Sequence, residues 1–90
     1  MAKAIIDPTE LRRFAQRLKQ FNSDLQNQVA SLQTQFQNLS STWRDQEHQK
    51  FAESFTQTMQ VIGRFIDAAD AHIPFLIRKA ERAEDYLEQR

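Results

Sequence analysis

The stretch NLSSTWRDQEHQKF, residues 38–51, separates two long amphipathic segments and thereby decides the fold. Its hydroxyl residues at 40–42 are unfavourable inside a helix and favourable at helix ends. Asp45 follows the single tryptophan, Trp43, and is a good N-cap for a helix that begins directly after it. We therefore expect one helix to end here, a turn over about residues 40–46, and a second helix to follow.

The segment before this turn has the start signal and the apolar spacing of one helix. Asp7 is a favourable N-cap, Pro8 suits the first helical position, and Glu10 stands three residues after the cap. Steps of three and four residues then join Leu11, Phe14, Leu18, Phe21, Leu25, Val29, Leu32, Phe36 and Leu39. With one interruption of the heptad at Gln28, this spacing predicts a nearly straight helix over about residues 8–40 with a narrow apolar stripe.

The segment after the turn carries two apolar lines. The first consists of Phe51, Phe55, Met59, Ile62, Ile66, Ala69, Ile73, Leu76, Ala80, Ala83 and Leu87. The second, offset by about 100° around a helix, consists of Val61, Phe65, Ala68, His72 and Phe75. Together they predict a helix over about residues 46–88 whose apolar face is broader than one neighbouring helix covers.

These features predict an all-α fold in which residues 1–90 form a single domain, an antiparallel two-helix hairpin. Pro74 lies inside the second helical pattern, where it lacks a backbone N–H and crowds the carbonyl of Asp70. We therefore expect the second helix to be kinked, or briefly broken, near residues 70–74. The apolar register continues beyond the proline, so the helix should resume on the same face.

The second apolar line leaves two arrangements open. Phe65 and Phe75 can fold back onto the first helix, aided by a bend at Pro74. Alternatively, a second hairpin covers the line and gives a four-helix bundle. Because burial of a large apolar side chain contributes about 1.5–3 kcal/mol, we expect pairing, either as a homodimer or with a paralogous hairpin. The expected interface consists of Val61, Phe65, Ala68, His72 and Phe75.

The composition argues against several classes of protein. Twelve Lys and Arg residues balance twelve Asp and Glu residues, which disfavours nucleic-acid binding. No apolar run approaches the ~18 residues that membrane insertion needs. The absence of cysteine excludes disulfides and thiolate metal sites, and one glycine disfavours a phosphate-binding loop. The apolar stretch within residues 1–7 is too short for a cleavable signal peptide, so we expect a cytoplasmic protein or one secreted without such a signal.

No group of residues predicts catalysis. Asp45, Glu47 and His48 lie close in sequence, but one Asp/His pair supplies too few ligands for a metal ion. The serines at 40–41 have no base at helical spacing, and His72 stands alone in the second apolar line as a packing residue or a pH-sensitive interface element. We expect no enzyme, metal or cofactor. A metal- or ligand-binding helical bundle is the alternative from another class.

Trp43 invites two compatible interpretations. It can close the end of the hairpin core by packing on Phe51 or Leu39. It can also form part of a surface groove that a partner recognises, as large aromatic residues often do.

The chain resembles the WXG family of small secreted helical hairpins, which type VII systems export. The likeness rests on two long amphipathic helices and a lone tryptophan, Trp43, at the bend between them. Phe51 and Phe55 then stand where the family's second helix begins with phenylalanines. At the third motif position, however, Asp45 replaces glycine.

This resemblance implies antiparallel hairpin dimers that serve as secretion substrates, chaperones or adaptors. It also implies an export signal in which a tyrosine precedes an acidic residue by four positions, whereas Tyr86 is followed at that distance by Arg90. We therefore expect a non-enzymatic interaction module, a secreted effector or secretion adaptor that acts as a dimer. A cytoplasmic adaptor or assembly chaperone with the same fold is the alternative.

Overall fold

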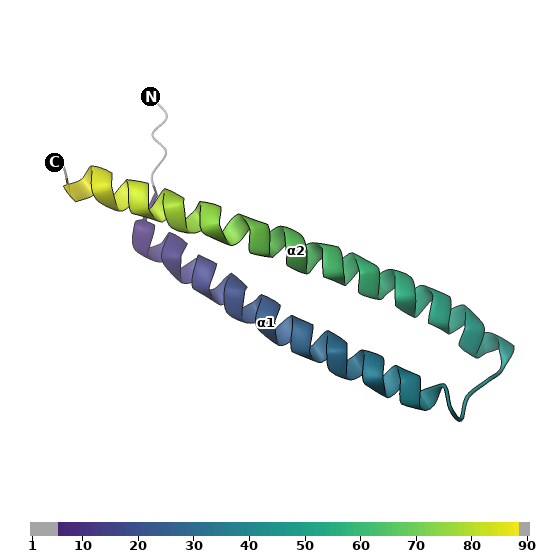
Figure 1. The fold of residues 1–90 in the computed structure, drawn as a ribbon. Helices are drawn as coiled ribbons and strands as arrows, with labels where there is room; N and C mark the ends of the chain where they lie inside the picture. Colours follow the sequence, from purple (N-terminus) through teal and green to yellow (C-terminus); the bar gives the residue numbers. More distant parts are fainter. Residues whose placement is uncertain (1–5, 89–90) are drawn as a thin grey trace.

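The computed structural model describes residues 6–88, which form two antiparallel helices joined by a short bend (Figure 1). Helix α1 spans Pro8–Leu39 and helix α2 spans Gln46–Glu88, with no strand in the described part. The fold is therefore the all-α hairpin that the sequence predicts. Residues 1–5, part of the stretch considered as a signal peptide, and Arg90 lie outside the described residues.

Both helices begin at an aspartate. Asp7 Oδ1 accepts hydrogen bonds from the backbone N–H groups of Thr9, at 2.9 Å, and Glu10, at 3.3 Å. Asp45 Oδ1 accepts a hydrogen bond from the backbone N–H of His48 at 2.9 Å. Each carboxylate thus satisfies N–H groups that the first turn of a helix leaves without partners.

Helix α2 continues through Pro74 without a break. Figure 1 shows it as one gently curved helix. The short break considered near residues 70–74 is therefore wrong. Ile73 and Ala80, one heptad apart on either side of the proline, are both buried, so a break would sacrifice packing on both sides. This packing offsets the hydrogen bond that the proline cannot donate.

The two helices meet along a line of mostly small and medium-sized side chains. On α1 this contact line has a seven-residue spacing and consists of Pro8, Ala15, Asn22, Val29 and Phe36. The buried residues of α2 are Ile66, Ala69, Ile73 and Ala80. Within the described residues no large side chain is fully buried. The core is therefore a thin seam along the hairpin.

The apolar stripe predicted for α1 coincides with this contact line only in part, because Val29 and Phe36 belong to both. Four of its members are 46–58% exposed: Phe14, Phe21, Leu32 and Leu39. Ala15 and Asn22 are buried instead, although each is smaller or more polar than its neighbours in the stripe. Small residues on the contact line let the helices approach closely, and the bulky residues beside them then lie to one side of the seam.

The hairpin is elongated, with extents of 68 × 25 × 15 Å and a radius of gyration of 20.1 Å. A compact domain of this length has a radius of about 12 Å. Its accessible surface is 7536 Å², against roughly 5,500 Å² for a compact protein of the same mass. Neither described helix is apolar enough over a sufficient length to cross a membrane.

Candidate interaction surface

One side of the hairpin gathers large exposed hydrophobic residues from both helices. Phe21 of α1 and Phe65 of α2 meet there edge to face, with ring centroids 6.3 Å apart. Nearer the bend, Leu32 and Leu39 of α1 line the same groove as Phe51 of α2. We call this surface the apolar face. Seven-residue helical spacing adds Phe14, which precedes Phe21 by seven positions, and Val61 and Phe75, which follow the groove-lining Ser54 by seven and twenty-one positions. The apolar face thus comprises the exposed residues Phe14, Phe21, Leu32, Leu39, Phe51, Val61, Phe65 and Phe75.

The apolar face is hollowed near the bend. The groove there has a volume of about 560 Å³, and its apolar lining residues are Leu32, Phe36, Leu39, Phe51, Phe55 and Met59. A second groove of about 500 Å³ is also lined by Phe36 and Phe55, but its polar lining residues are Gln33, Gln37, Thr56 and Gln60. The two grooves therefore differ in chemistry, one being mainly hydrocarbon and the other rich in side-chain amides.

Trp43 is half-buried and packs against the start of α2. Its ring meets His48 edge-on at 5.1 Å and lies tilted against Phe51 at 6.2 Å between centroids. His48 in turn stacks on Phe36 of α1 at 5.4 Å. The expected packing of Trp43 on Phe51 is confirmed, and its backbone N–H also donates to the carbonyl of Leu39 at 3.0 Å. We call Phe36, Trp43, His48, Phe51 and Phe55 the aromatic cluster.

Hydrogen bonds fix this cluster to both helix ends. Ser40 Oγ donates to the carbonyl of Phe36 at 3.0 Å and lies 2.8 Å from His48 Nε2. Because the hydroxyl has only one proton, His48 Nε2 is assigned as the donor in the second contact. The hydrogen bond from the His48 amide, followed by that from the Trp43 indole, holds the pKa of Asp45 below its usual range. Asp45 therefore caps α2 at the position where the family motif has glycine.

Sequence reasoning rejected His48 as a metal ligand and did not predict a contact between His48 and Ser40. In the structure its imidazole is directed to Ser40, while Asp45 binds its backbone N–H. Among residues 6–88 there is no group of three or more His, Cys, Asp or Glu side chains that could hold a metal ion. The eight-residue spacing between a helix-ending serine and a histidine in the next first turn is the signal that could have suggested their contact.

The five residues predicted as an interface are exposed in the single hairpin: Val61, Phe65, Ala68, His72 and Phe75. Folding back onto α1 is incomplete, because Phe65 touches Phe21 and is still 49% exposed. Phe75 is 64% exposed, and the guanidinium of Arg78 lies over its ring at 5.0 Å. The chain's own α1 therefore does not cover this line, and its role as an interface stays a prediction.

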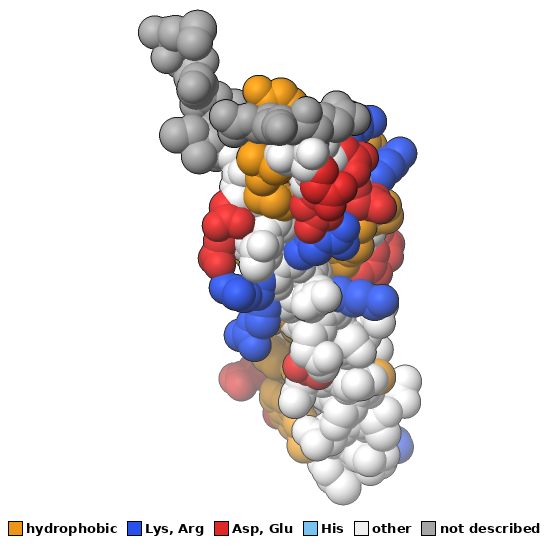
Figure 2. Space-filling view, turned by 90° about the vertical axis from the view of Figure 1, so that its left-hand side faces the viewer, with side chains coloured by type: hydrophobic (Ala, Val, Ile, Leu, Met, Phe, Trp, Pro, Cys, Tyr) orange, Lys and Arg blue, Asp and Glu red, His pale blue; other side chains and the backbone are white. Residues whose placement is uncertain are grey.

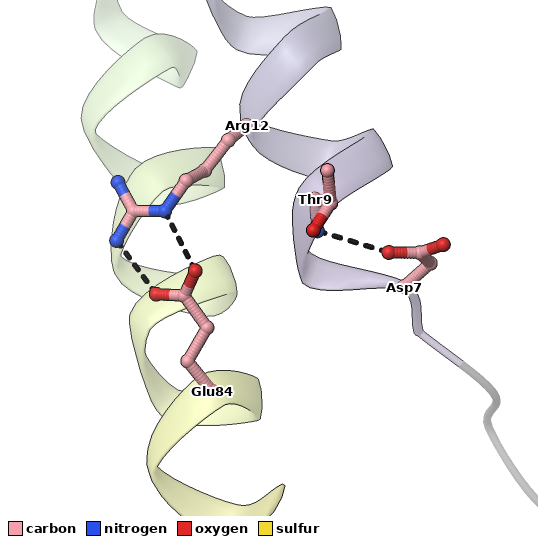
Figure 3. A network of polar contacts seen from close by, with 4 residues as sticks. All are labelled: Asp7, Thr9, Arg12 and Glu84. Atoms are coloured by element: carbon pink, nitrogen blue, oxygen red, sulfur yellow. Dashed lines mark hydrogen bonds and ion pairs between the residues drawn. The ribbon is translucent and has the colours of Figure 1, made fainter.

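At the other end of the hairpin, an ion pair joins the start of α1 to the end of α2 (Figure 3). Arg12 Nε and Nη2 donate to Glu84 Oε2 and Oε1 at 3.0 and 2.7 Å. This hydrogen bonding lowers the pKa of Glu84 and raises that of Arg12. Figure 2 shows acidic and basic side chains interspersed around this end, whereas the sequence holds no charge within 25–43 or 54–63.

Asn22 is a buried polar residue on the contact line, with 2% of its surface exposed. Its Nδ2 donates to Asp70 Oδ1 at 3.0 Å and to the carbonyl of Ile66 at 3.3 Å. Its Oδ1 is buried without a hydrogen-bond partner, a situation that typically costs about 1–3 kcal/mol. The apolar stripe predicted for this helix did not include Asn22. The seven-residue series through Ala15 and Val29 is the signal that could have found it.

Comparison with known proteins agrees with this architecture. The sequence profile of the WXG100 family, described as proteins of 100 residues with WXG, matches residues 4–86. The crystal structure of a mutant of the secreted protein EsxB from Bacillus anthracis str. Sterne has a TM-score of 0.74 and 27% identity, covering 93% of this chain and 97% of that one. The crystal structure of wild-type EsxB has a TM-score of 0.74 and 28% sequence identity, covering 91% of this chain and 88% of that one. No curated protein matches. The chain belongs to the WXG100 family.

Proposed function

We propose that the protein is a non-enzymatic interaction module that acts as a dimer of hairpins, either as a secreted effector or as an adaptor in type VII secretion. The observation that carries this proposal is the apolar face, whose eight large side chains are 46–64% exposed along both helices. Isolated exposed hydrophobic residues are common, but a continuous surface of this kind typically marks an interaction site.

The size of the unburied surface supports a partner of similar dimensions. The hairpin exposes roughly 2,000 Å² more than a compact protein of its mass. A standard stable interface buries about 800 Å² on each partner. Covering the apolar face with a second hairpin would therefore remove roughly two fifths of this excess surface.

A second copy is the simplest partner. A two-fold axis would bring the same apolar face of each chain together, which is the commonest symmetry of soluble oligomers. No charged residue lies within 25–43 or 54–63, so these two stretches of the face carry no like charges that would oppose self-association. A paralogous hairpin would use the same face.

Sedimentation equilibrium tests the dimer. Wild-type protein should sediment as a dimer, and the double variant Phe65→Glu/Phe75→Glu should shift it toward a monomer by placing two charges in the apolar face. The matched control Gln33→Glu/Gln60→Glu adds the same charge at the amide-lined groove and should remain dimeric. A wild-type chain that stays a folded monomer at high concentration rules out the homodimer.

Export is the second element of the proposal. It is supported by the family and by EsxB, which is described as a secreted protein. The export signal has an acidic residue four positions after its tyrosine, whereas Tyr86 is followed at that distance by Arg90. This mismatch leaves two possible roles for the chain. Either a hairpin partner supplies the signal, or the chain works inside the cell as an adaptor or assembly chaperone.

Fractionation of the native bacterium distinguishes these roles. The untagged chain should accumulate in the culture medium of the wild-type strain and not in that of a strain lacking the secretion ATPase, with a cytoplasmic enzyme as the lysis control. Replacing Arg90 by Glu tests whether the chain can be exported without a partner's signal. Retention of the wild-type chain in both strains refutes export and leaves the intracellular role.

A further inference from the structure

We infer that Asn22 and Asp70 set the register of the hairpin, that is, the position of α1 along α2. This role is independent of the proposed function, because it concerns how one chain chooses a single fold. In this role, the Asn22–Asp70 pair excludes arrangements in which one helix is shifted along the other. It does not serve mainly to add stability.

The geometry of Asn22 defines one axial position. Its Nδ2 donates both to the side chain of Asp70 and to the backbone carbonyl of Ile66. A slide of α1 by one helical turn, about 5.4 Å, would break both hydrogen bonds and leave a buried amide without acceptors. Such a penalty rises steeply with displacement because hydrogen bonds tolerate little change in length or angle.

Toward the chain termini, away from the aromatic cluster, the other contacts along the seam define the register less well. Ala15 and Ala80 are buried, and short smooth side chains of this kind lack the interlocking shape that resists sliding. The Arg12–Glu84 pair has side chains that are 39% and 36% exposed. A slid Arg12 could pair with Glu81 or Glu88, which lie one turn to either side of Glu84.

The unpaired Oδ1 of Asn22 also argues against a purely stabilising role. An apolar residue at this position would remove the buried atom that lacks a partner and would pack against Ile66 and Ala69. Coiled coils use a buried asparagine on the contact line in this way, since it specifies one register at a cost in stability. Asn22 occupies the equivalent place in an intramolecular hairpin.

Distance measurements between two spin labels test the inference. The chain has no native cysteine, so cysteines introduced at Gln16 and Gln57 can be labelled selectively. Both positions are exposed, and they lie about 25 Å apart along the hairpin axis, so sliding by one turn changes their separation directly. Labelled chains are diluted into excess unlabelled protein of the same variant, which removes distances between copies.

The labelled chain with Asn22 and Asp70 intact should give one narrow distance distribution. Asn22→Leu should give a broadened or two-peaked distribution while the melting temperature is unchanged or higher. Asp70→Ala should also broaden it, and because Asp70 is exposed this change leaves the packed seam intact. The matched control is Asn27→Leu, at an exposed position of α1, and it should stay narrow.

A narrow, unshifted distribution in folded Asn22→Leu overturns the inference and assigns the register to apolar packing and the bend. If Asn22→Leu fails to fold, the result for Asp70→Ala decides: broadening supports the polar pair, and a narrow distribution refutes it. Broadening in Asn27→Leu as well would show that any added leucine loosens the hairpin, which also refutes a specific role for Asn22.

Discussion

The two ends of the hairpin are held together by different kinds of contact. At the bend, the rings of the aromatic cluster pack across the two helices, and the uncharged stretches 25–43 and 54–63 adjoin it. Toward the end with the chain termini, Ala15, Ile73 and Ala80 form a thin seam and a partly exposed ion pair lies beside it. Since partly exposed ion pairs contribute little, the bend end should supply most of the stability of a single hairpin.

The same difference applies to the surface offered to a partner. Near the bend, large side chains serve both purposes, because Phe36 and Phe55 pack between the helices and also line the apolar groove. Toward the termini, Phe75 is 64% exposed and belongs to the surface offered to a partner, not to the packing between the helices. Mutations near the bend should therefore disturb the fold and the interface together, whereas mutations at Phe75 should act on association alone.

Trp43→Ala should be the most damaging of the changes considered. Removing a fully buried tryptophan costs about 3–5 kcal/mol, and at this half-buried site we expect about 2–3 kcal/mol. Chemical denaturation at fixed protein concentration measures the loss. Tyr86→Ala, at a residue that is 67% exposed at the other end, is the control and should change little. An unchanged free energy of unfolding in Trp43→Ala would mean that this ring is presented to a partner and does not support the hairpin.

Pro74→Ala should strengthen the half of the hairpin near the termini. Alanine restores a backbone N–H that can donate to the carbonyl of Asp70, and α2 already continues through this position. We expect equal or greater helicity by circular dichroism and a gain of about 1–2 kcal/mol. A marked loss of helicity would show that the proline imposes a curvature that the packing of α2 requires.

Asp45→Ala should lower the melting temperature by about 4–8 °C, since it removes the cap of α2. Asp45→Asn retains a capping oxygen and should have a milder effect. The folded-state pKa of Asp45 is lowered, so its charge stabilises the fold above the unfolded-state pKa, and this contribution disappears as pH falls through the folded-state value. The difference between wild type and Asp45→Asn should therefore shrink below about pH 4. A difference that is constant down to pH 2 would contradict the charged cap.

The features predicted correctly from sequence are those with local causes. The start of each helix follows from one aspartate and the residues just after it, and the bend follows from the stretch around Trp43. The contact line of α1 was found only in part in this way, at Val29 and Phe36, because hydrophobic spacing does not distinguish residues that face α2 from those that face a partner. Phe21 and Leu32 belong to the predicted stripe and are exposed, while Asn22 is buried. The close approach of the two helices determines which residues of α1 face α2. That approach depends on small side chains from both helices.

Glu84→Gln should have the smallest effect on stability of the changes considered. It tests the contribution of the ion pair at the end of the hairpin with the chain termini. It removes the charge that pairs with Arg12, and for so exposed a pair we expect the melting temperature to fall by at most about 4 °C. The pKa of Glu84 is lowered, so the pair stabilises the fold above the unfolded-state pKa and this contribution is lost as pH falls through the folded-state value. The effect should also fade in high salt. A larger loss than that of Trp43→Ala, unaffected by salt, would reverse the assignment of stability to the bend end.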